Sequence, residues 1–216
     1  MKMKLHFESQ VHFQRLVLGV ICGLLPILCV LFGLISCTIG GQEWYLLQSV
    51  SETYYTNHKI IMITALGLCT FFFTTYKGYD IGDRIFTALA ALGSFGVAAF
   101  PCWSLAAKEI EGLFSLPILT SNTLHMISAC LVFGSFAIMT ITQFTKGNDK
   151  KRNIVYYVCG AIMLAAIIMC AIRMWLGWAG YWVMVFEFIM LEAFAVAWIT
   201  KSKAVFTKGE SNEQAD

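Results

Sequence analysis

The stretch IVYYVCGAIMLAAIIMCAIRM, residues 154–174, contains a single charged side chain, Arg173, near its end. A helix that crosses the hydrocarbon core of a bilayer needs about 20 predominantly apolar residues. The run is too long and too continuous for the short alternating strands of a membrane β-barrel. A helix is the remaining structure that satisfies every backbone polar group in lipid, so these residues predict a transmembrane helix.

Five further runs of the same kind lie along the chain. The six predicted spans are residues 16–36, 60–76, 85–103, 124–144, 154–174 and 181–200. They predict an all-α fold, a polytopic bundle of six transmembrane helices in a single domain (1–203), followed by a polar tail (204–216).

The composition supports this interpretation. Apolar residues make up 58% of the chain and charged residues 13%, whereas a soluble domain carries about 25% charged residues. The mean hydropathy of +0.71 excludes a soluble globular protein and a disordered one. The net charge of +2, without a basic stripe, argues against a nucleic-acid partner. The expected partners are membrane lipids, and the oligomeric state is left open.

Lysine and arginine are distributed unevenly between the two sides of the predicted bundle, and such residues mark the cytoplasmic side. Three lie on one side: Lys59, Lys108 and Arg173. Twelve lie on the other: Lys2, Lys4, Arg15, Lys77, Arg84, Lys146, Lys150, Lys151, Arg152, Lys201, Lys203 and Lys208. This bias predicts a multi-pass protein of the cell (inner) membrane with both termini cytoplasmic.

The segment Leu34-Ile35-Ser36-Cys37 is typical of a bacterial lipoprotein cleavage site. The apolar core of a signal peptide has about 7–15 residues, whereas the run before Cys37 has about 21, enough to span a bilayer. We therefore expect the first helix to be retained.

Small residues recur at four-residue spacing on two predicted helices. Gly19 and Gly23 form one such pair, and Ala90, Ser94 and Ala98 form a second series. Small residues let helix backbones approach closely in a membrane, so we expect intramolecular packing at both places.

Two of the eight cysteines, Cys37 and Cys102, end predicted helices on the outer side. Disulfides persist in that compartment, so we predict that they pair. The other six lie within spans and are interpreted as small buried hydrophobic residues.

Ionisable side chains inside a membrane are costly and mark candidate sites. Arg173 and Glu187 lie near the outer ends of consecutive helices, so they could form a buried ion pair, or Arg173 could extend to the headgroups. Glu192 is deeper and lies about 140° around the helix from Glu187. It is either a protonated carboxyl group or part of a proton relay.

Further polar side chains are predicted at the outer mouth of the bundle. The full candidate set is Glu52, Tyr55, His58, His125, Arg173 and Glu187. One interpretation is a pocket for a lipid headgroup or small amphiphile. Another is a Zn²⁺ site formed by His58, His125 and Glu187 with one open position. A third is a set of unrelated interfacial residues.

The segment between the second and third spans is a candidate site on the cytoplasmic side. Its charged residues are Lys77, Asp80, Asp83 and Arg84. They form either a tight turn in which Asp83 caps the next helix or a clamp for an anionic headgroup or a partner protein. On the outer side, residues 104–121 mix charged and apolar positions and predict a short interfacial helix, ended by Pro117, that covers the outer cluster.

Several short motifs carry a family resemblance. They are residues 49–55 (SVSETYY), 76–80 (YKGYD), Asp83-Arg84, Phe100-Pro101, His125 and residues 187–198. This set resembles an uncharacterised six-span bacterial integral membrane family, which is similar in layout to the Frag1/DRAM/Sfk1 group. The resemblance covers about two-thirds of the chain. It implies a six-helix fold and a connection to lipid organisation, with the acidic segment of the first outer loop matched by Ser49 to Glu52.

A second similarity, to membrane hydrolases that include alkaline ceramidases, rests on Ser51, His58 and His125. Those enzymes use further histidines and seven spans, which this chain lacks. No nucleotide-binding or hydrolase motif is present in the sequence.

The leading hypothesis is a non-catalytic lipid-binding, sensing or organising protein that needs no cofactor. The alternatives are a metal-dependent lipid hydrolase or acyltransferase, with Zn²⁺, and a small proton-coupled transporter that uses Glu192.

Overall fold

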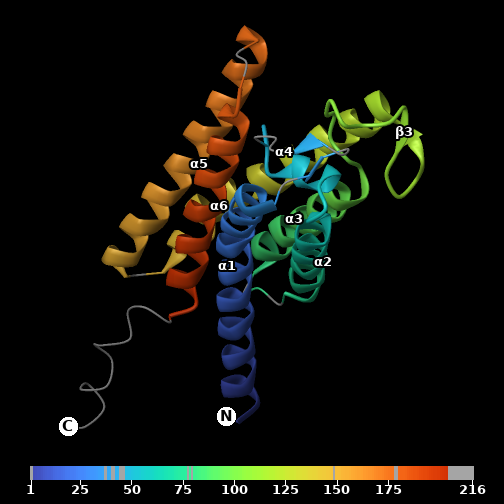
Figure 1. Cartoon of the computed structure of the whole chain (residues 1–216). Coiled ribbons are helices and arrows are strands. Elements are labelled where there is room, and N and C mark those ends of the chain that lie inside the picture. Colours follow the sequence, from blue (N-terminus) through green and yellow to red (C-terminus); the bar gives the residue numbers. More distant parts are fainter. Residues whose placement is uncertain are drawn as a thin grey trace, which may run out of the picture.

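The computed structural model of the chain is a bundle of helices joined by loops (Figure 1). It describes residues 2–36, 38–39, 42–43, 47–76, 78, 80–147, 149–177 and 180–203. Within these ranges the elements are α1 (Lys2–Ser36), β1 (Thr38–Ile39), β2 (Gln42–Glu43), the 3₁₀ helix η1 (Ser51–Tyr55), α2 (Lys59–Thr75), α3 (Ile81–Ala99), β3 (Ile110–Glu111), β4 (Leu116–Pro117), α4 (Ile118–Thr142), the 3₁₀ helix η2 (Phe144–Lys146), α5 (Lys150–Leu176) and α6 (Trp182–Lys201).

The predicted all-α bundle is confirmed. In the described part of the chain, five helices are long and apolar enough to cross a membrane, and the sixth, α2, is an apolar helix of 17 residues. Each predicted span falls on one α-helix. The largest difference is at α1, which begins at Lys2 instead of residue 16. The helix continues beyond the apolar run because Val11 and Arg15, at 1% and 2% exposure, still pack against the bundle.

The helices form a closed ring in chain order. Each helix from α1 to α5 packs against the next one, and α6 returns to pack against α1. The paired glycines of α1 explain the last contact. A Cβ atom at Gly19 would lie 2.8 Å from Cγ1 of Ile199, and one at Gly23 would lie 3.0 Å from Cβ of Ala195. The predicted intramolecular packing at this GxxxG pair is confirmed, because only glycine permits this approach.

An aromatic cluster fills the interior of the ring. Phe136 and Phe194 stack with their ring centroids 3.6 Å apart. Trp198 is fully buried and contacts Phe73 and Phe144 edge-on, at centroid distances of 5.8 and 5.4 Å. Rings from α2, α4, η2 and α6 therefore share one core.

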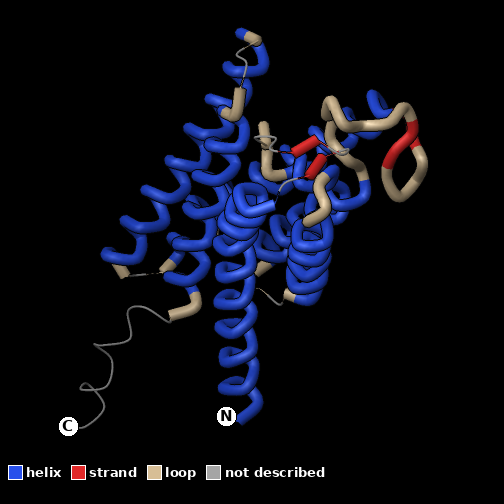
Figure 2. Tube along the Cα trace, viewed as in Figure 1, coloured by secondary structure: helices blue, strands red, loops and turns tan. Residues whose placement is uncertain are grey.

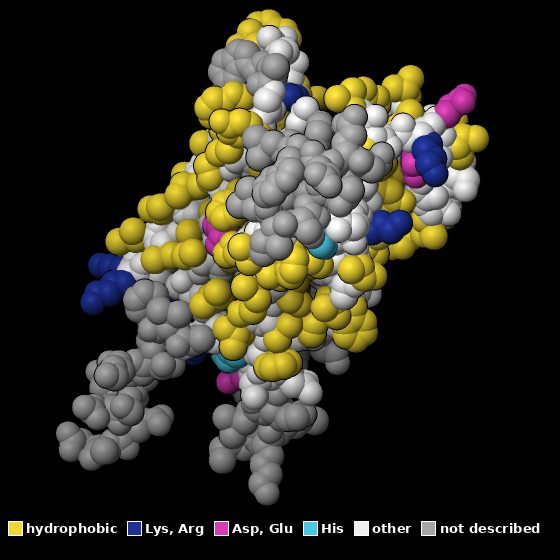
Figure 3. Space-filling view, viewed as in Figure 1, with side chains coloured by type: hydrophobic (Ala, Val, Ile, Leu, Met, Phe, Trp, Pro, Cys, Tyr) yellow, Lys and Arg dark blue, Asp and Glu magenta, His cyan; other side chains and the backbone are white. Residues whose placement is uncertain are grey.

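The two ends of the bundle differ in character. The basic end carries Arg15, Arg84, Lys146 and Lys201, and α1 and α6 meet there, since Nη1 of Arg15 donates to the carbonyl oxygen of Lys201 at 3.5 Å. The opposite end, the cap end, carries the described parts of residues 37–58 and 100–121. In Figure 3 hydrophobic side chains cover most of the visible lateral surface between these ends, as expected for a surface in contact with lipid.

The predicted interfacial helix at residues 104–121 is wrong. The segment forms a small antiparallel hairpin in which Ile110 pairs with Pro117 and Glu111 pairs with Leu116 (Figure 2). A left-handed backbone at Gly112 (φ 86°) makes the turn, and a Cβ atom there would lie 2.6 Å from Cδ of Pro101. Pro117 does not end a helix but precedes the first residue of α4.

Candidate functional site

At the cap end, a segment of the connection between α1 and α2 is inserted between the helices. We call residues 48–55, which include η1, the plug. Ser51, Glu52 and Thr53 are buried, at 8%, 3% and 1% exposure. The backbone N–H of Met184 in α6 donates to the carbonyl oxygen of Gln48 at 2.9 Å, so α6 holds the start of the plug.

Glu187 of α6 binds the plug directly. Its Oε2 accepts a hydrogen bond from the backbone N–H of Val50 at 2.6 Å. The predicted ion pair with Arg173 is absent from the ion pairs of the described residues, and Nε of Arg173 is buried without a hydrogen-bond partner. The hydrogen-bond partner of the buried Glu187 carboxyl group is thus a backbone N–H of the plug and not a cation.

Glu52 joins the two loops of the cap end. Its Oε2 accepts from the backbone N–H of Gln48 at 2.7 Å, and its Oε1 accepts from Oγ of Ser104 at 2.7 Å. Tyr55 adds a second link, since its hydroxyl donates to the carbonyl oxygen of Cys102 at 2.6 Å. Burial raises the pKa of the Tyr55 phenol, so this hydroxyl stays a donor over the physiological pH range.

The two histidines of the predicted set have different surroundings. Nδ1 of His125 lies 2.7 Å from the carbonyl oxygen of Phe100, where α3 ends. The ring of His58 packs against Phe32 of α1 at a centroid distance of 5.3 Å. Across the residues that the structure describes, no three His, Cys, Asp or Glu side chains are grouped so that they could hold a metal ion. The proposed ligands His58, His125 and Glu187 therefore do not form a ready Zn²⁺ site.

The void below the plug is small. It measures about 50 Å³ and is lined mainly by apolar side chains of five helices, with Ser51 and Glu187 as its polar members. Glu52, Tyr55 and Glu187 thus come together, as the sequence suggested, but their hydrogen bonds fasten the plug and the loop at residues 102–104. A ligand-binding role for the six outer residues stays a prediction.

Cys102 is buried at the cap end, at 8% exposure, and burial raises the pKa of its thiol to about 12. Cys37 lies outside the described residues, so its pairing with Cys102 also stays a prediction.

At the basic end, the turn between α2 and α3 is built around Asp80. Its Oδ1 accepts from the backbone N–H of Asp83 at 2.9 Å, so Asp80 caps α3 and the predicted cap at Asp83 is wrong. Its Oδ2 pairs with Nζ of Lys146 at 2.5 Å, and this hydrogen bond lowers the pKa of Asp80. Lys77 lies outside the described residues. Arg84 is exposed and forms no ion pair or side-chain hydrogen bond with a described residue.

In the sequence, Arg15 and Lys201 stood out only as part of the basic bias, but both side chains contribute to the fold. Arg15 is 2% exposed, and its Nε donates to the hydroxyl of Tyr76 at 2.8 Å. Nζ of Lys201 donates to the carbonyl oxygen of Phe144 at 2.8 Å and lies 5.4 Å from the ring centre of Tyr156. Arg15 directly precedes the first apolar run, and that position was the one available signal that it belongs to the helix.

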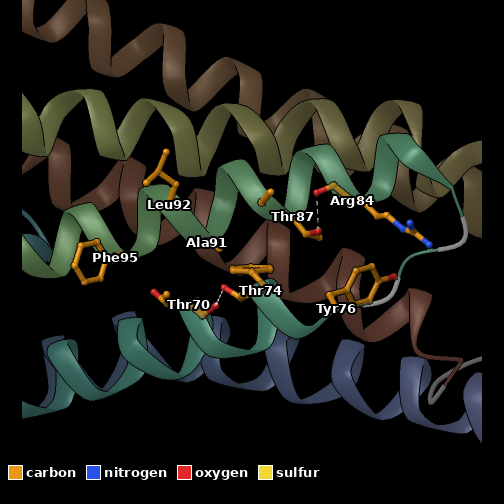
Figure 4. Close-up of a pocket in the computed structure, with 10 residues that line it drawn as sticks. Thr70, Thr74, Tyr76, Arg84, Thr87, Ala91, Leu92 and Phe95 are labelled. Carbon is orange, nitrogen blue, oxygen red and sulfur yellow. Dashed lines mark hydrogen bonds between the residues drawn. The ribbon is translucent and has the colours of Figure 1, made fainter.

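A lateral groove lies between α2 and α3 at the basic end. It has a volume of about 500 Å³. Its ten lining residues are Thr70, Phe73, Thr74, Tyr76, Arg84, Thr87, Ala88, Ala91, Leu92 and Phe95. Figure 4 shows Arg84 and Tyr76 at one end of the groove and Phe95 at the other.

The groove has a buried floor and open edges. Phe73, Tyr76 and Ala91 are buried, whereas Ala88 and Leu92 are exposed on the edge. Small residues on α3 leave the space that a larger side chain would fill. Because Leu92 is 60% exposed, the groove opens on the surface that faces lipid in a membrane protein.

The threonine hydroxyls of the groove are satisfied within their own helices. Oγ1 of Thr70 donates to the carbonyl oxygen of Leu66 at 2.9 Å, and that of Thr74 to the carbonyl oxygen of Thr70 at 2.7 Å. Oγ1 of Thr87 donates to the carbonyl oxygen of Asp83 at 2.9 Å. These three hydroxyl groups therefore need no hydrogen-bond acceptor from a ligand. Arg84 is the one charged residue among the ten that line the groove.

Comparison of the chain with family models, with curated proteins and with solved structures finds no match. The class follows from the fold itself. The chain forms an apolar all-helical bundle of the kind that integral membrane proteins have.

Proposed function

We propose that this protein binds a membrane lipid or similar amphiphile without chemical conversion and acts in membrane sensing or organisation. The observation that carries the proposal is the groove between α2 and α3, which joins a basic side chain at one end to an apolar channel of about 500 Å³. A headgroup and an acyl chain have the same arrangement of polar and apolar parts. The resemblance to the Frag1/DRAM/Sfk1 group, which is linked to lipid remodelling and membrane organisation, is in line with this role.

This proposal moves the binding site from the outer mouth to the basic end. At the outer mouth Glu52 and Glu187 already bind the plug, and the void below it, about 50 Å³, is much smaller than an acyl chain. The metal-dependent hydrolase receives no support from the donor groups of the described residues. A transporter role for Glu192 would rest on one buried carboxyl oxygen that has no hydrogen-bond partner.

The test is a pair of tryptophan substitutions at exposed alanines on the lateral surface. Ala88→Trp fills the edge of the groove, and Ala161→Trp adds the same bulk to an exposed position on α5. Native mass spectrometry in mild detergent should show a lipid adduct on the wild type and on Ala161→Trp, and a strongly reduced one on Ala88→Trp. An adduct of equal abundance on both variants, or none on the wild type, would overturn the proposal.

A further inference from the structure

We infer that the occupant of the groove is an anionic phospholipid from the leaflet at the basic end, with its phosphate at Arg84 and one acyl chain extending toward Phe95. This inference rests on the proposed function and adds the class of headgroup, the leaflet and the direction of the chain.

The charge at the mouth of the groove favours an anion. None of the ten lining residues is acidic, and Arg84 is exposed and has no ion pair with a described residue. Of the two acidic residues just before Arg84 in the sequence, Asp80 is paired with Lys146 and Asp83 is buried, at 6% exposure. The guanidinium of Arg84 is therefore available, and its planar array of donors suits a phosphate group.

The length of the groove matches one leaflet. Arg84 and Phe95 are 11 residues apart on α3, which corresponds to about 16 Å along a helix. The hydrocarbon core of a bilayer is about 30 Å thick, so the groove covers about half of it. With Arg84 at the headgroup level, the chain would end near the middle of the membrane.

The walls of the groove suit an acyl chain better than a helix of a second copy. The hydroxyls of Thr70, Thr74 and Thr87 are bonded within their own helices. Their hydroxyl hydrogens are therefore already used, and they offer no free hydrogen-bond donor to whatever lies in the groove.

The experiment measures headgroup preference. Delipidated protein in mild detergent is mixed with equal amounts of phosphatidylglycerol and phosphatidylcholine that have identical acyl chains, and native mass spectrometry compares the two adducts. One cation near a headgroup contributes about 1 kcal/mol, so the wild type should prefer phosphatidylglycerol by about fivefold. Arg84→Gln should lose this preference. Lys150→Gln removes the same charge from an exposed position at the basic end, away from the groove, and should keep it.

Each other outcome has a definite meaning. Equal binding of the two lipids by the wild type would overturn this inference and leave the proposed function standing, whereas no adduct of either lipid would overturn both. Loss of the preference in Lys150→Gln as well would show a diffuse charge effect and refute the role of Arg84. A dimer peak that replaces the lipid adduct and disappears in Ala88→Trp would show that a second copy fills the groove.

Discussion

The two ends of the bundle are held together in different ways. At the basic end, helices contact one another directly through Trp198, Arg15 and Lys201, which come from α1 and α6. At the cap end, loop segments are inserted between helices, and carboxylates bind their backbone N–H groups and hydroxyls. The basic end is thus held by direct contacts between helices, which combine aromatic packing with hydrogen bonds, and the cap end by hydrogen bonds to inserted loops. The buried acidic residues of the cap end can therefore have a structural role, because they hold the loops in place. The lateral surface of the basic end retains a groove.

The largest expected effect comes from removing packing at the basic end. Trp198→Ala should lower the free energy of unfolding by about 3–5 kcal/mol, because it leaves a cavity among Phe73, Phe144 and Phe194. Thermal unfolding in detergent measures this. Trp103 at the cap end is 53% exposed, and Trp103→Ala should change stability by less than about 0.5 kcal/mol. Equal losses in the two variants would refute the difference between the ends.

The next effect separates a bonded carboxylate from an unbonded one on the same helix. Glu187→Ala leaves the backbone N–H of Val50 without its acceptor and should cost about 1–3 kcal/mol. Glu187→Gln retains an acceptor oxygen and should cost less.

The matched control for Glu187 is Glu192, whose Oε1 is buried without a hydrogen-bond partner. Glu192→Ala should therefore be neutral or stabilising in the same unfolding assay. If Glu192→Ala were as destabilising as Glu187→Ala, bonding to the plug would not be the reason for the effect.

A smaller effect on stability is expected where the plug meets the loop at residues 102–104. Ser104→Ala removes the hydroxyl that donates to Oε1 of Glu52 and should cost about 1 kcal/mol. Hydrogen exchange should show faster exchange in the plug and unchanged exchange in α6 near Trp198. Uniformly faster exchange through the whole bundle would contradict a local role for this bond.

The smallest effect concerns pH at the basic end. Lys146 lowers the pKa of Asp80 in the folded protein, so the ionised carboxylate favours folding. That contribution is present above the pKa of the unfolded chain, near 4, and is lost as the pH falls through the lower folded pKa. The wild type should therefore lose more stability than Lys146→Ala over this acidic range, when both are followed by thermal unfolding. Identical pH profiles would show that the Asp80–Lys146 ion pair does not contribute to the pH dependence of stability.

Much of the fold was predictable because lipid imposes a simple requirement on the chain. Long apolar runs located all six helices, and Gly19 and Gly23 identified a close helix contact. The start of α1 was missed because the residues before position 16 are polar overall, although Val11 and Arg15 pack against the bundle. The hairpin at residues 110–117 was missed because its left-handed turn at Gly112 depends on contact with Pro101.

The candidate site was less predictable. The sequence showed that Glu187 must find a partner, but the partner is a backbone N–H group, which nearly every residue has, so no side-chain pattern marks it. The groove depends on how α2 and α3 lie against each other, and the sequence of either helix does not reveal this. Arg84 was found as a charged turn residue, yet its place at the mouth of the groove required the structure.

The most direct test of lipid binding in the groove between α2 and α3 is to locate the retained lipid. A phospholipid with a photoreactive diazirine in its acyl chain would be bound to the protein, bulk lipid removed, and the labelled residues identified by peptide mass spectrometry. We expect label concentrated on residues 70–76 and 84–95, and its loss in Ala88→Trp. Label concentrated on the plug, or spread evenly over the exposed faces of all six helices, would contradict it.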